Sequence, residues 1–165
     1  MTIKTIRTVA QTTKLGQWLG QQLPIGCVVA LNGNLGAGKT TFVKAIMQGM
    51  SSEDSVHSPA FTLVAEYQAK RKKQTFSVYH MDFYRLETLS DMDYLLFAEY
   101  MDDDTATKLI EWADKFIEQF ANDYLSIEIK ATSLNDEEQR QFTFQVVGDN
   151  AELKQLLKGL ETYRV

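Results

Sequence analysis

The pattern of apolar and polar residues divides the first part of the chain into alternating strands and helices. Residues 2–9 alternate weakly, which is typical of an edge strand. From Thr12 onward, apolar residues fall on one helical face until Pro24 and Gly26 interrupt the pattern. The short apolar run at 27–31 predicts a buried central strand. After a glycine-rich turn, apolar residues over 43–50 recur at helical spacing and predict a second amphipathic helix.

The remaining residues continue this mixture. Residues 61–67 and 75–83 are expected to be strands, and the polar turn 69–74 is short enough to require an antiparallel pair. A helical stretch is expected over 86–100, and a short strand over 108–112. Two clearly alternating strands and a final amphipathic helix follow, marked by Leu125-Ile127-Ile129, Phe142-Phe144-Val146 and Leu153-Leu156-Leu157-Leu160. Together, these predicted strands and helices indicate one α/β domain over residues 1–165, with a mixed parallel and antiparallel sheet flanked by helices.

Composition narrows the class of protein. The chain has 165 residues, of which 44% are hydrophobic, so it suffices for one domain with a sizeable core but not for two ordinary domains. No apolar run is long enough for a membrane span, and Cys27 is the single cysteine, so we expect a cytoplasmic protein without membrane attachment or an internal disulfide. The net charge of −5 argues against a protein that binds nucleic acid without the help of a partner.

The strongest chemical signal is the segment Gly33-Asn34-Leu35-Gly36-Ala37-Gly38-Lys39-Thr40. It fits the phosphate-binding pattern G-x-x-x-x-G-K-[ST] and stands between a predicted buried strand and an amphipathic helix. The glycines let backbone N–H groups converge on phosphate oxygens, Lys39 adds a positive charge for the β- and γ-phosphates, and the Thr40 hydroxyl is a ligand for Mg²⁺. A P-loop NTPase-like domain that binds a nucleoside triphosphate is therefore expected.

A phosphate loop needs a further acidic partner for magnesium, usually at the end of a neighbouring strand. Asp82 and Glu111 both end predicted strands, and either fits that position. The chain lacks an N-K-x-D element for guanine and the L-S-G-G-Q signature of transporter ATPases. Only five of its basic residues are arginine, which argues against a small-molecule kinase with an arginine-rich lid. A phosphotransferase and a non-hydrolysing nucleotide-gated switch remain as alternatives to an ATPase.

Four segments in order resemble the TsaE family, the ATPase of bacterial tRNA threonylcarbamoyladenosine biosynthesis. They are the phosphate loop extended to Thr41, then Ser58-Pro59-Ala60-Phe61-Thr62-Leu63-Val64, His80-Met81-Asp82-Phe83-Tyr84-Arg85-Leu86 and Ile110-Glu111-Trp112. The match covers about residues 12–114, whereas the C-terminal third fits by strand pattern only. The resemblance implies an ATPase that works with the partner proteins TsaB and TsaD, meets tRNA indirectly through that complex, and hydrolyses ATP weakly alone.

The resemblance also implies roles for individual residues. Thr40 and Glu111 would bind Mg²⁺, with Asp82 acting through a metal-bound water, and Lys39, Asp82 and Glu111 would form the catalytic set. The adenine would lie near the start of the first helix, around Val9. The other nucleotide-binding positions would be the loop from Asn34 to Thr41, which comprises Asn34, Leu35, Gly36, Ala37, Gly38, Lys39, Thr40 and Thr41, together with Thr62 as a γ-phosphate sensor and Trp112 beside the nucleotide.

The chain departs from the family pattern at two positions. Asn34 stands where the family commonly has an acidic residue, and Ala60 stands where it has a threonine. Asn34 can still form hydrogen bonds but lacks the negative charge, and position 60 is expected to have no polar role. For Arg85, contact with a phosphate and a surface salt bridge are equally open. His80 could orient Asp82, but packing within the sheet is the favoured interpretation.

Overall fold

A computed structural model of the chain describes residues 1–52, 54–132 and 138–165. Seven strands form a single sheet in the order β1-β7-β6-β2-β5-β4-β3. The strands are β1 (Thr2–Ile6), β2 (Val28–Asn32), β3 (Val64–Arg71), β4 (Gln74–Asp82), β5 (Thr107–Glu111), β6 (Tyr124–Ala131) and β7 (Arg140–Val147). The α-helices are α1 (Val9–Gln22), α2 (Lys39–Gly49), α3 (Asp91–Met101) and α4 (Ala151–Thr162), and 3-10 turns lie at Ala113–Lys115 and Ile117–Gln119.

The sheet has a parallel centre and antiparallel edges. Strand β2 pairs in parallel with both β5 and β6, and β5 pairs in parallel with β4. The pairs β3–β4, β6–β7 and β1–β7 are antiparallel. The expected α/β class with a mixed sheet flanked by helices is therefore confirmed.

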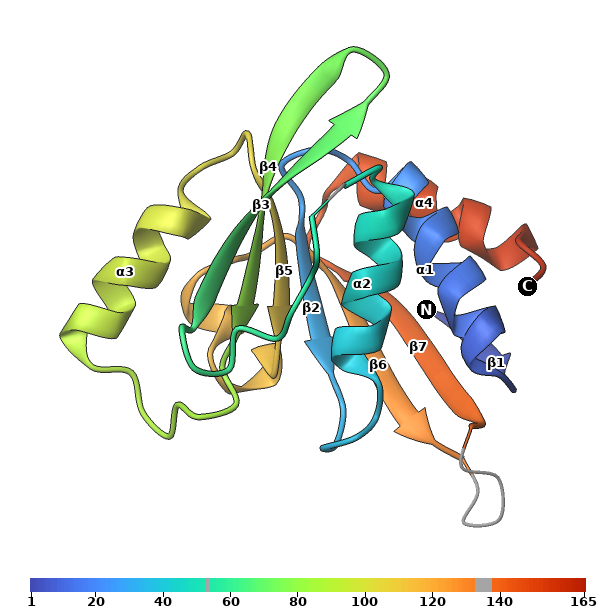
Figure 1. Cartoon of the computed structure of the whole chain (residues 1–165), viewed down its shortest axis with the longest axis horizontal. Helices are drawn as coiled ribbons and strands as arrows, with labels where there is room; N and C mark the ends of the chain where they lie inside the picture. Colours follow the sequence, from blue (N-terminus) through green and yellow to red (C-terminus); the bar gives the residue numbers. More distant parts are fainter. Residues whose placement is uncertain (53, 133–137) are drawn as a thin grey trace.

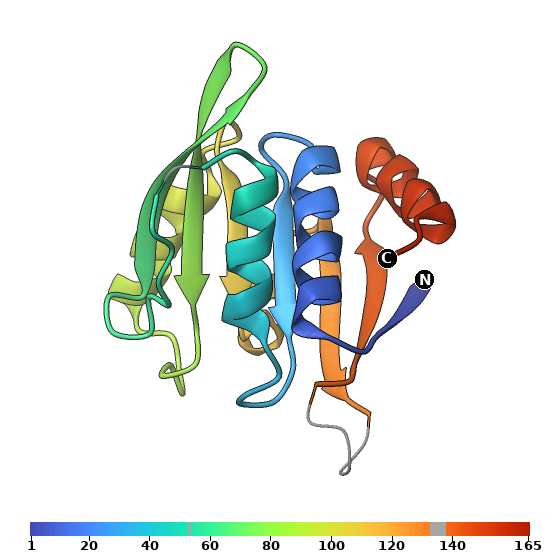
Figure 2. The same ribbon diagram turned by 45° about the vertical axis from the view of Figure 1, so that its right-hand side comes forward.

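Helices cover both faces of the sheet. Helices α1, α2 and α4 pack on one face, whereas α3 and the 3-10 turns lie on the other (Figures 1 and 2). In β2, Val29 and Leu31 belong to the core beneath α1 and α2, while Val28 and Ala30 belong to the core on the α3 side. Both faces of β2 are buried from Val28 to Leu31, and these residues are all apolar, as the sequence predicts.

The topology brings several loops to one edge of the sheet. Strands β2, β4 and β5 all end at the lower edge in Figure 1, where the loop from β2 to α2 also lies. In open sheets with parallel strands, ligands bind at this edge, beyond the carboxyl ends of the strands.

Several elements begin or end at other residues than the sequence predicts. Strand β1 ends at Ile6 and α1 begins at Val9, because the Thr8 side chain caps the helix by accepting a hydrogen bond from the Gln11 N–H. Strand β3 begins at Val64, since Leu63 adopts a φ of 65° and donates its N–H to the Pro59 carbonyl. A capping box at Ser90 starts α3 later than expected.

The connection between β3 and β4 is tighter than the predicted turn at 69–74. The strands run to Arg71 and from Gln74, so Lys72 and Lys73 alone form the turn, and Lys72 has a φ of 56°. Arg71 therefore belongs to the strand, and its guanidinium donates a hydrogen bond to the Gly20 carbonyl. Within the described residues, no helix is both long and apolar enough to cross a membrane.

Candidate nucleotide site

The phosphate loop lies where β2 gives way to α2. Gly33 and Gly38 have φ values of 139° and 103°, which residues with a side chain rarely adopt. A Cβ at Gly33 would stand 2.3 Å from the Ile129 carbonyl oxygen, so β6 approaches the loop too closely for any larger residue. Gly38 directly precedes α2, whose N-terminal N–H groups and positive dipole end therefore face the loop.

Lys39 is held within this loop. Its Nζ donates hydrogen bonds to the carbonyls of Gly33 at 2.7 Å and Asn34 at 3.0 Å, and it lies 3.7 Å from the centroid of a Trp112 ring. Only 5% of Lys39 is exposed. Burial lowers the pKa of Lys39, and the negative charges of Glu111 and Asp82 oppose that shift. The ammonium group therefore stands among loop carbonyls and acidic side chains, within the span of the phosphate loop.

Glu111 joins the loop to the centre of the sheet. Its carboxylate accepts a hydrogen bond from the Thr40 hydroxyl at 3.0 Å, and its other oxygen lies 2.9 Å from Nε2 of His80. Glu111 and His80 are both buried. His80 is packed within the sheet, as expected from sequence, and it also contacts the carboxylate that the Thr40 hydroxyl contacts.

Asp82 stands beside Glu111 on the neighbouring strand. The two residues are direct partners in the parallel β4–β5 register. Asp82 accepts hydrogen bonds from the Ser58 hydroxyl at 3.0 Å and from the Tyr84 N–H at 2.9 Å. It is also buried, so two carboxylates lie out of solvent at the same edge of the sheet.

These donors suit a hard divalent cation. A hydroxyl oxygen and two carboxylates are the ligand types that Mg²⁺ prefers, and Mg²⁺ usually keeps waters and takes only one or two carboxylates from the protein. Buried carboxylates are costly unless they are paired, and a cation between Asp82 and Glu111 would balance their charge. Thr40, Glu111 and Asp82 therefore fit Mg²⁺ by chemistry and by placement.

The residues around these groups enclose a cleft of about 410 Å³. Sequence reasoning named most of its lining residues: Leu35, Gly36, Gly38, Lys39, Thr40, Thr41, Asp82, Glu111 and Trp112. Asn34 and Ala37 belong to the loop but do not line the cleft. Thr62 is exposed in the segment before β3, and Val9 is the exposed first residue of α1; neither lines the cleft.

Five further residues of the site were not among the predicted nucleotide-binding or metal-binding residues, although the sequence leaves a phosphate contact open for Arg85. Ser58, Ala60, Tyr84 and Arg85 line the cleft, and His80 contacts Glu111 beneath it. The period of two along a strand could have identified His80, because it shares a sheet face with Asp82. Arg85 makes a cation–π contact with Phe61, its guanidinium carbon lying 3.9 Å from the ring centroid.

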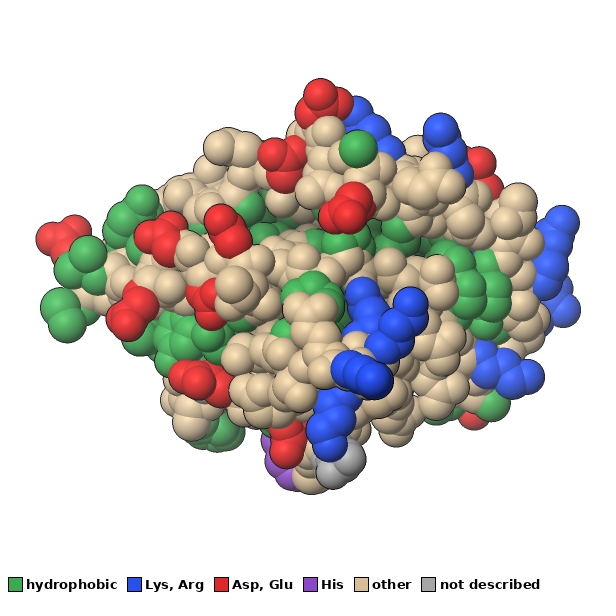
Figure 3. Space-filling model, turned by 90° about the horizontal axis from the view of Figure 1, so that it is seen from above, with side chains coloured by type: hydrophobic (Ala, Val, Ile, Leu, Met, Phe, Trp, Pro, Cys, Tyr) green, Lys and Arg blue, Asp and Glu red, His purple; other side chains and the backbone are tan. Residues whose placement is uncertain are grey.

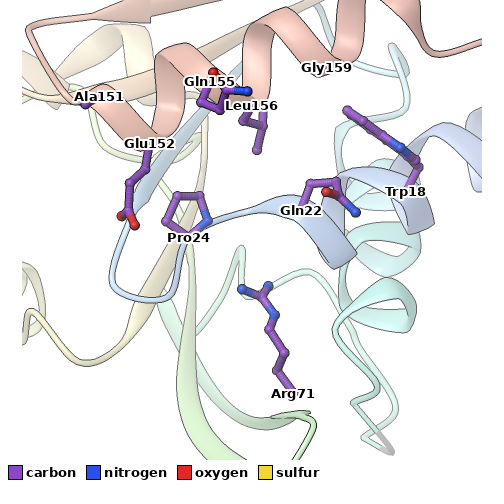
Figure 4. A pocket seen from close by; sticks show the side chains of 9 residues that line it. All are labelled: Trp18, Gln22, Pro24, Arg71, Ala151, Glu152, Gln155, Leu156 and Gly159. Carbon is purple, nitrogen blue, oxygen red and sulfur yellow. The ribbon is translucent and has the colours of Figure 1, made fainter.

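A larger cavity of about 570 Å³ lies elsewhere, between α1, α4 and the end of β3 (Figure 4). Trp18, Pro24 and Leu156 give it largely apolar walls, and Arg71 points into it from below. It contains neither the phosphate loop nor a carboxylate from the edge where β2, β4 and β5 end. Of these two cavities, the smaller cleft is the better candidate site, since it combines phosphate-binding and cation-binding groups.

Comparisons with known proteins identify the family of this chain. A family model described as "Threonylcarbamoyl adenosine biosynthesis protein TsaE" matches residues 6–142. A TsaE protein of Synechocystis is 37% identical over 107 residues, which are 63% of this chain and 65% of that relative, slightly less than two thirds of its length. A TsaE protein of Mycobacterium tuberculosis is 35% identical over 136 residues, or 80% of each chain.

A solved structure extends the similarity over nearly the whole fold. The crystal structure of YdiB from Bacillus subtilis superposes with a TM-score of 0.72 at 28% sequence identity, covering 96% of this chain and 93% of that one. The matched family model includes the phosphate loop, Asp82 and Glu111. By its sequence and its fold, this chain belongs to the TsaE family.

Proposed function

We propose that the chain is the Mg²⁺-dependent, ATP-binding and ATP-hydrolysing component of the machinery that makes N6-threonylcarbamoyladenosine in tRNA. Family membership supports the pathway, because the matching model and relatives are named for this biosynthesis. The observation that carries the chemical part is the contact of Thr40 with Glu111 at 3.0 Å, directly behind the loop that holds Lys39. A phosphate-loop hydroxyl and a strand-end carboxylate meeting in this way favour a Mg²⁺–nucleotide site.

In this proposal the phosphates lie along the loop from Asn34 to Thr41. Backbone N–H groups at the start of α2 donate to the phosphate oxygens, and Lys39 turns from the loop carbonyls toward the β- and γ-phosphates. Thr40, Glu111 and Asp82 would hold the cation, with Asp82 acting through a water. A Mg²⁺ ion held there would supply positive charge to offset that of the phosphates.

Hydrolysis would then depend on positioning and electrostatics. Lys39 and the loop N–H groups would balance the charge that develops while a water attacks in line, and a bound cation would add positive charge. Arg85 lines the cleft but stacks against Phe61, an exposed residue of the segment before β3. A partner that displaced Phe61 would free Arg85 for the phosphates, which would account for weak activity of the chain alone.

Three further residues are proposed to lie close to the nucleotide. Trp112 borders the cleft beside Lys39 and would lie close to the nucleotide. Thr62, four residues after Ser58, would approach the γ-phosphate if the segment that precedes β3 closed over the cleft. The adenine would extend toward Val9 at the start of α1, which is exposed and open to a ligand.

The proposed partners are the proteins TsaB and TsaD, with tRNA engaged through them in the cytoplasm. A net charge of −5 is compatible with this arrangement, because the chain itself need not grip the tRNA backbone. The proposal differs from a phosphotransferase, which would leave a phosphorylated small molecule, and from a non-hydrolysing switch, which would release no phosphate.

The test compares the wild-type chain with Lys39→Ala and with Lys44→Ala, an exposed lysine on the same helix. ATP affinity is measured by calorimetry, and phosphate release is measured with TsaB, TsaD and tRNA present. We expect Lys39→Ala to weaken binding by at least about tenfold and to abolish release, since a charged hydrogen bond contributes about 1.5–3 kcal/mol. Lys44→Ala should match wild type.

Unchanged affinity and turnover in Lys39→Ala would refute the nucleotide site. If the wild-type chain binds ATP but releases no phosphate in a single-turnover assay with TsaB, TsaD and tRNA, the result would favour the switch. Formation of a phosphorylated small molecule would favour the phosphotransferase.

A further inference from the structure

Helix α3 exposes apolar side chains where a surface helix normally presents polar ones. Met92 is 75% exposed and Leu95 is 63% exposed, and Leu96 is also open to solvent. Only Phe97 and Met101 of this helix are buried. A surface helix usually carries one apolar stripe toward the core and polar residues outside, so a second apolar face marks a site of interaction.

The buried side of α3 is firmly anchored. The Phe97 ring packs edge-on against Phe83, with centroids 4.8 Å apart, and also contacts Phe120. Tyr94 stacks on Phe120 at 5.2 Å, and a capping box at Ser90 fixes the start of the helix. The exposed apolar face is therefore presented by an ordered helix, and the core interactions of α3 are already satisfied on its other side.

The segment of the chain that carries this face is acidic. Residues 86–107 contain seven acidic residues and no lysine or arginine. Figure 3 shows the same asymmetry, since the end of the molecule that carries α3 displays apolar and acidic side chains, whereas the basic ones gather elsewhere. The exposed acids next to the apolar face include Asp91, Glu99 and Asp102.

The acidic charge around α3 indicates which kind of molecule could bind its exposed apolar face. A second copy of the chain would bring one acidic rim against another, and nucleic acid or an anionic membrane would be repelled. A protein surface with an apolar groove bordered by lysine and arginine would complement both the apolar face and its rim. We propose that α3 is the docking helix for such a protein partner.

The position of α3 in the chain links docking to the nucleotide cleft. The helix connects β4 to β5, the strands that end in Asp82 and Glu111. Phe83, the ring on which Phe97 packs, directly follows Asp82, and the next residues, Tyr84 and Arg85, line the cleft. A partner that shifts α3 would move these groups through one packed contact. This inference rests on the proposed function, because it assigns a partner-dependent regulation to that site.

The experiment measures binding of the purified TsaB–TsaD proteins to this chain in the presence of ATP and Mg²⁺. The double variant Met92→Gln/Leu95→Gln removes the apolar face with helix-compatible residues. Glu99→Lys/Asp102→Lys reverses the rim charge near the helix C-terminus, where positive charge favours the helix. Ile3→Thr, an exposed apolar residue on β1 at the opposite edge of the sheet, is the matched control.

We expect each double variant to bind at least about tenfold more weakly, while Ile3→Thr binds as wild type does. Wild-type affinity should fall as salt rises, and the charge-reversed variant should lose most of that dependence. Unfolding temperature and ATP affinity of the isolated variants should stay at wild-type values, because the changed side chains are exposed and outside the cleft.

Wild-type binding that both double variants retain would overturn the docking assignment and leave the proposed function intact. Failure of the wild-type chain to bind TsaB–TsaD would overturn both, and the Lys39→Ala comparison would still report separately on the nucleotide site. Self-association of the chain that Met92→Gln/Leu95→Gln abolishes, seen by light scattering, would assign the face to a second copy and overturn the heterologous partner.

Discussion

His80 provides a direct test of how the cation site is held, because it contacts the expected cation ligand Glu111. Among the described residues, the Glu111 carboxylate contacts the Thr40 hydroxyl at 3.0 Å and His80 Nε2 at 2.9 Å. His80→Leu removes one of them and frees the carboxylate to rotate. His80→Gln keeps an N–H donor of similar reach, so it should retain most of the contact.

His80→Leu is expected to weaken metal binding and to lower the free energy of unfolding. Loss of a partner that orients a metal ligand typically weakens metal binding about 10- to 100-fold, which corresponds to roughly 1.4–2.7 kcal/mol. For folding, a lost hydrogen bond to a charged group costs about 1.5–3 kcal/mol. Leucine offsets part of this cost by removing His80 Nδ1, a buried atom without a hydrogen-bond partner among the described residues. Net destabilisation should therefore stay within about 2 kcal/mol.

The assay titrates Mg²⁺ at fixed ATP and follows nucleotide binding, with urea unfolding measured in parallel. His80→Leu should raise the half-saturating Mg²⁺ concentration, and His80→Gln should restore it toward wild type. In a Glu111→Gln background, the further change His80→Leu should have little effect, since the histidine acts through that carboxylate. The exposed His57→Gln serves as the control. Equal Mg²⁺ dependence of wild type and His80→Leu would refute the reasoning.

Further predictions concern packing and reactivity. Gly20→Ala should destabilise the protein by about 1–3 kcal/mol in urea unfolding, because the new Cβ would lie 2.1 Å from the Ile46 carbonyl oxygen; unchanged stability would contradict the close contact of α1 with α2. Gly159→Ala in α4 should instead stabilise it by up to about 1 kcal/mol, since its Cβ would meet Trp18 at an ordinary 3.7 Å, and a clear loss would count against that geometry. Burial raises the pKa of the Cys27 thiol to about 12, so a thiol-exchange reagent at pH 8 should label it only after unfolding; rapid labelling of the native protein would disprove this.

The sequence predicted the fold well wherever periodicity and burial coincide. The apolar run at 27–31 became β2, and the residues from Val43 onward became the buried face of α2. Boundaries were less predictable because caps and turns set them. Thr8 begins α1 earlier than the apolar pattern does, and Leu63 delays β3 through a left-handed backbone conformation that no composition rule foresees.

The site was predictable to the extent that it follows from one local motif and the ends of strands. The loop glycines, Lys39 and Thr40 are contiguous, and Asp82 and Glu111 end neighbouring strands, so their convergence follows from topology. The role of His80 required knowledge of the register that sets β4 beside β5. The stacking of Arg85 on Phe61 joins two loops, and only their three-dimensional path reveals it.

The central claim, that this chain supplies ATP-dependent function to tRNA modification, is tested most directly inside cells. The chain is depleted from its source organism, either the wild-type protein or Lys39→Ala is supplied, and tRNA nucleosides are measured by mass spectrometry. We predict that threonylcarbamoyladenosine falls on depletion, returns with the wild-type chain and does not return with Lys39→Ala. Threonylcarbamoyladenosine that persists after depletion, or that Lys39→Ala restores in full, would contradict the account.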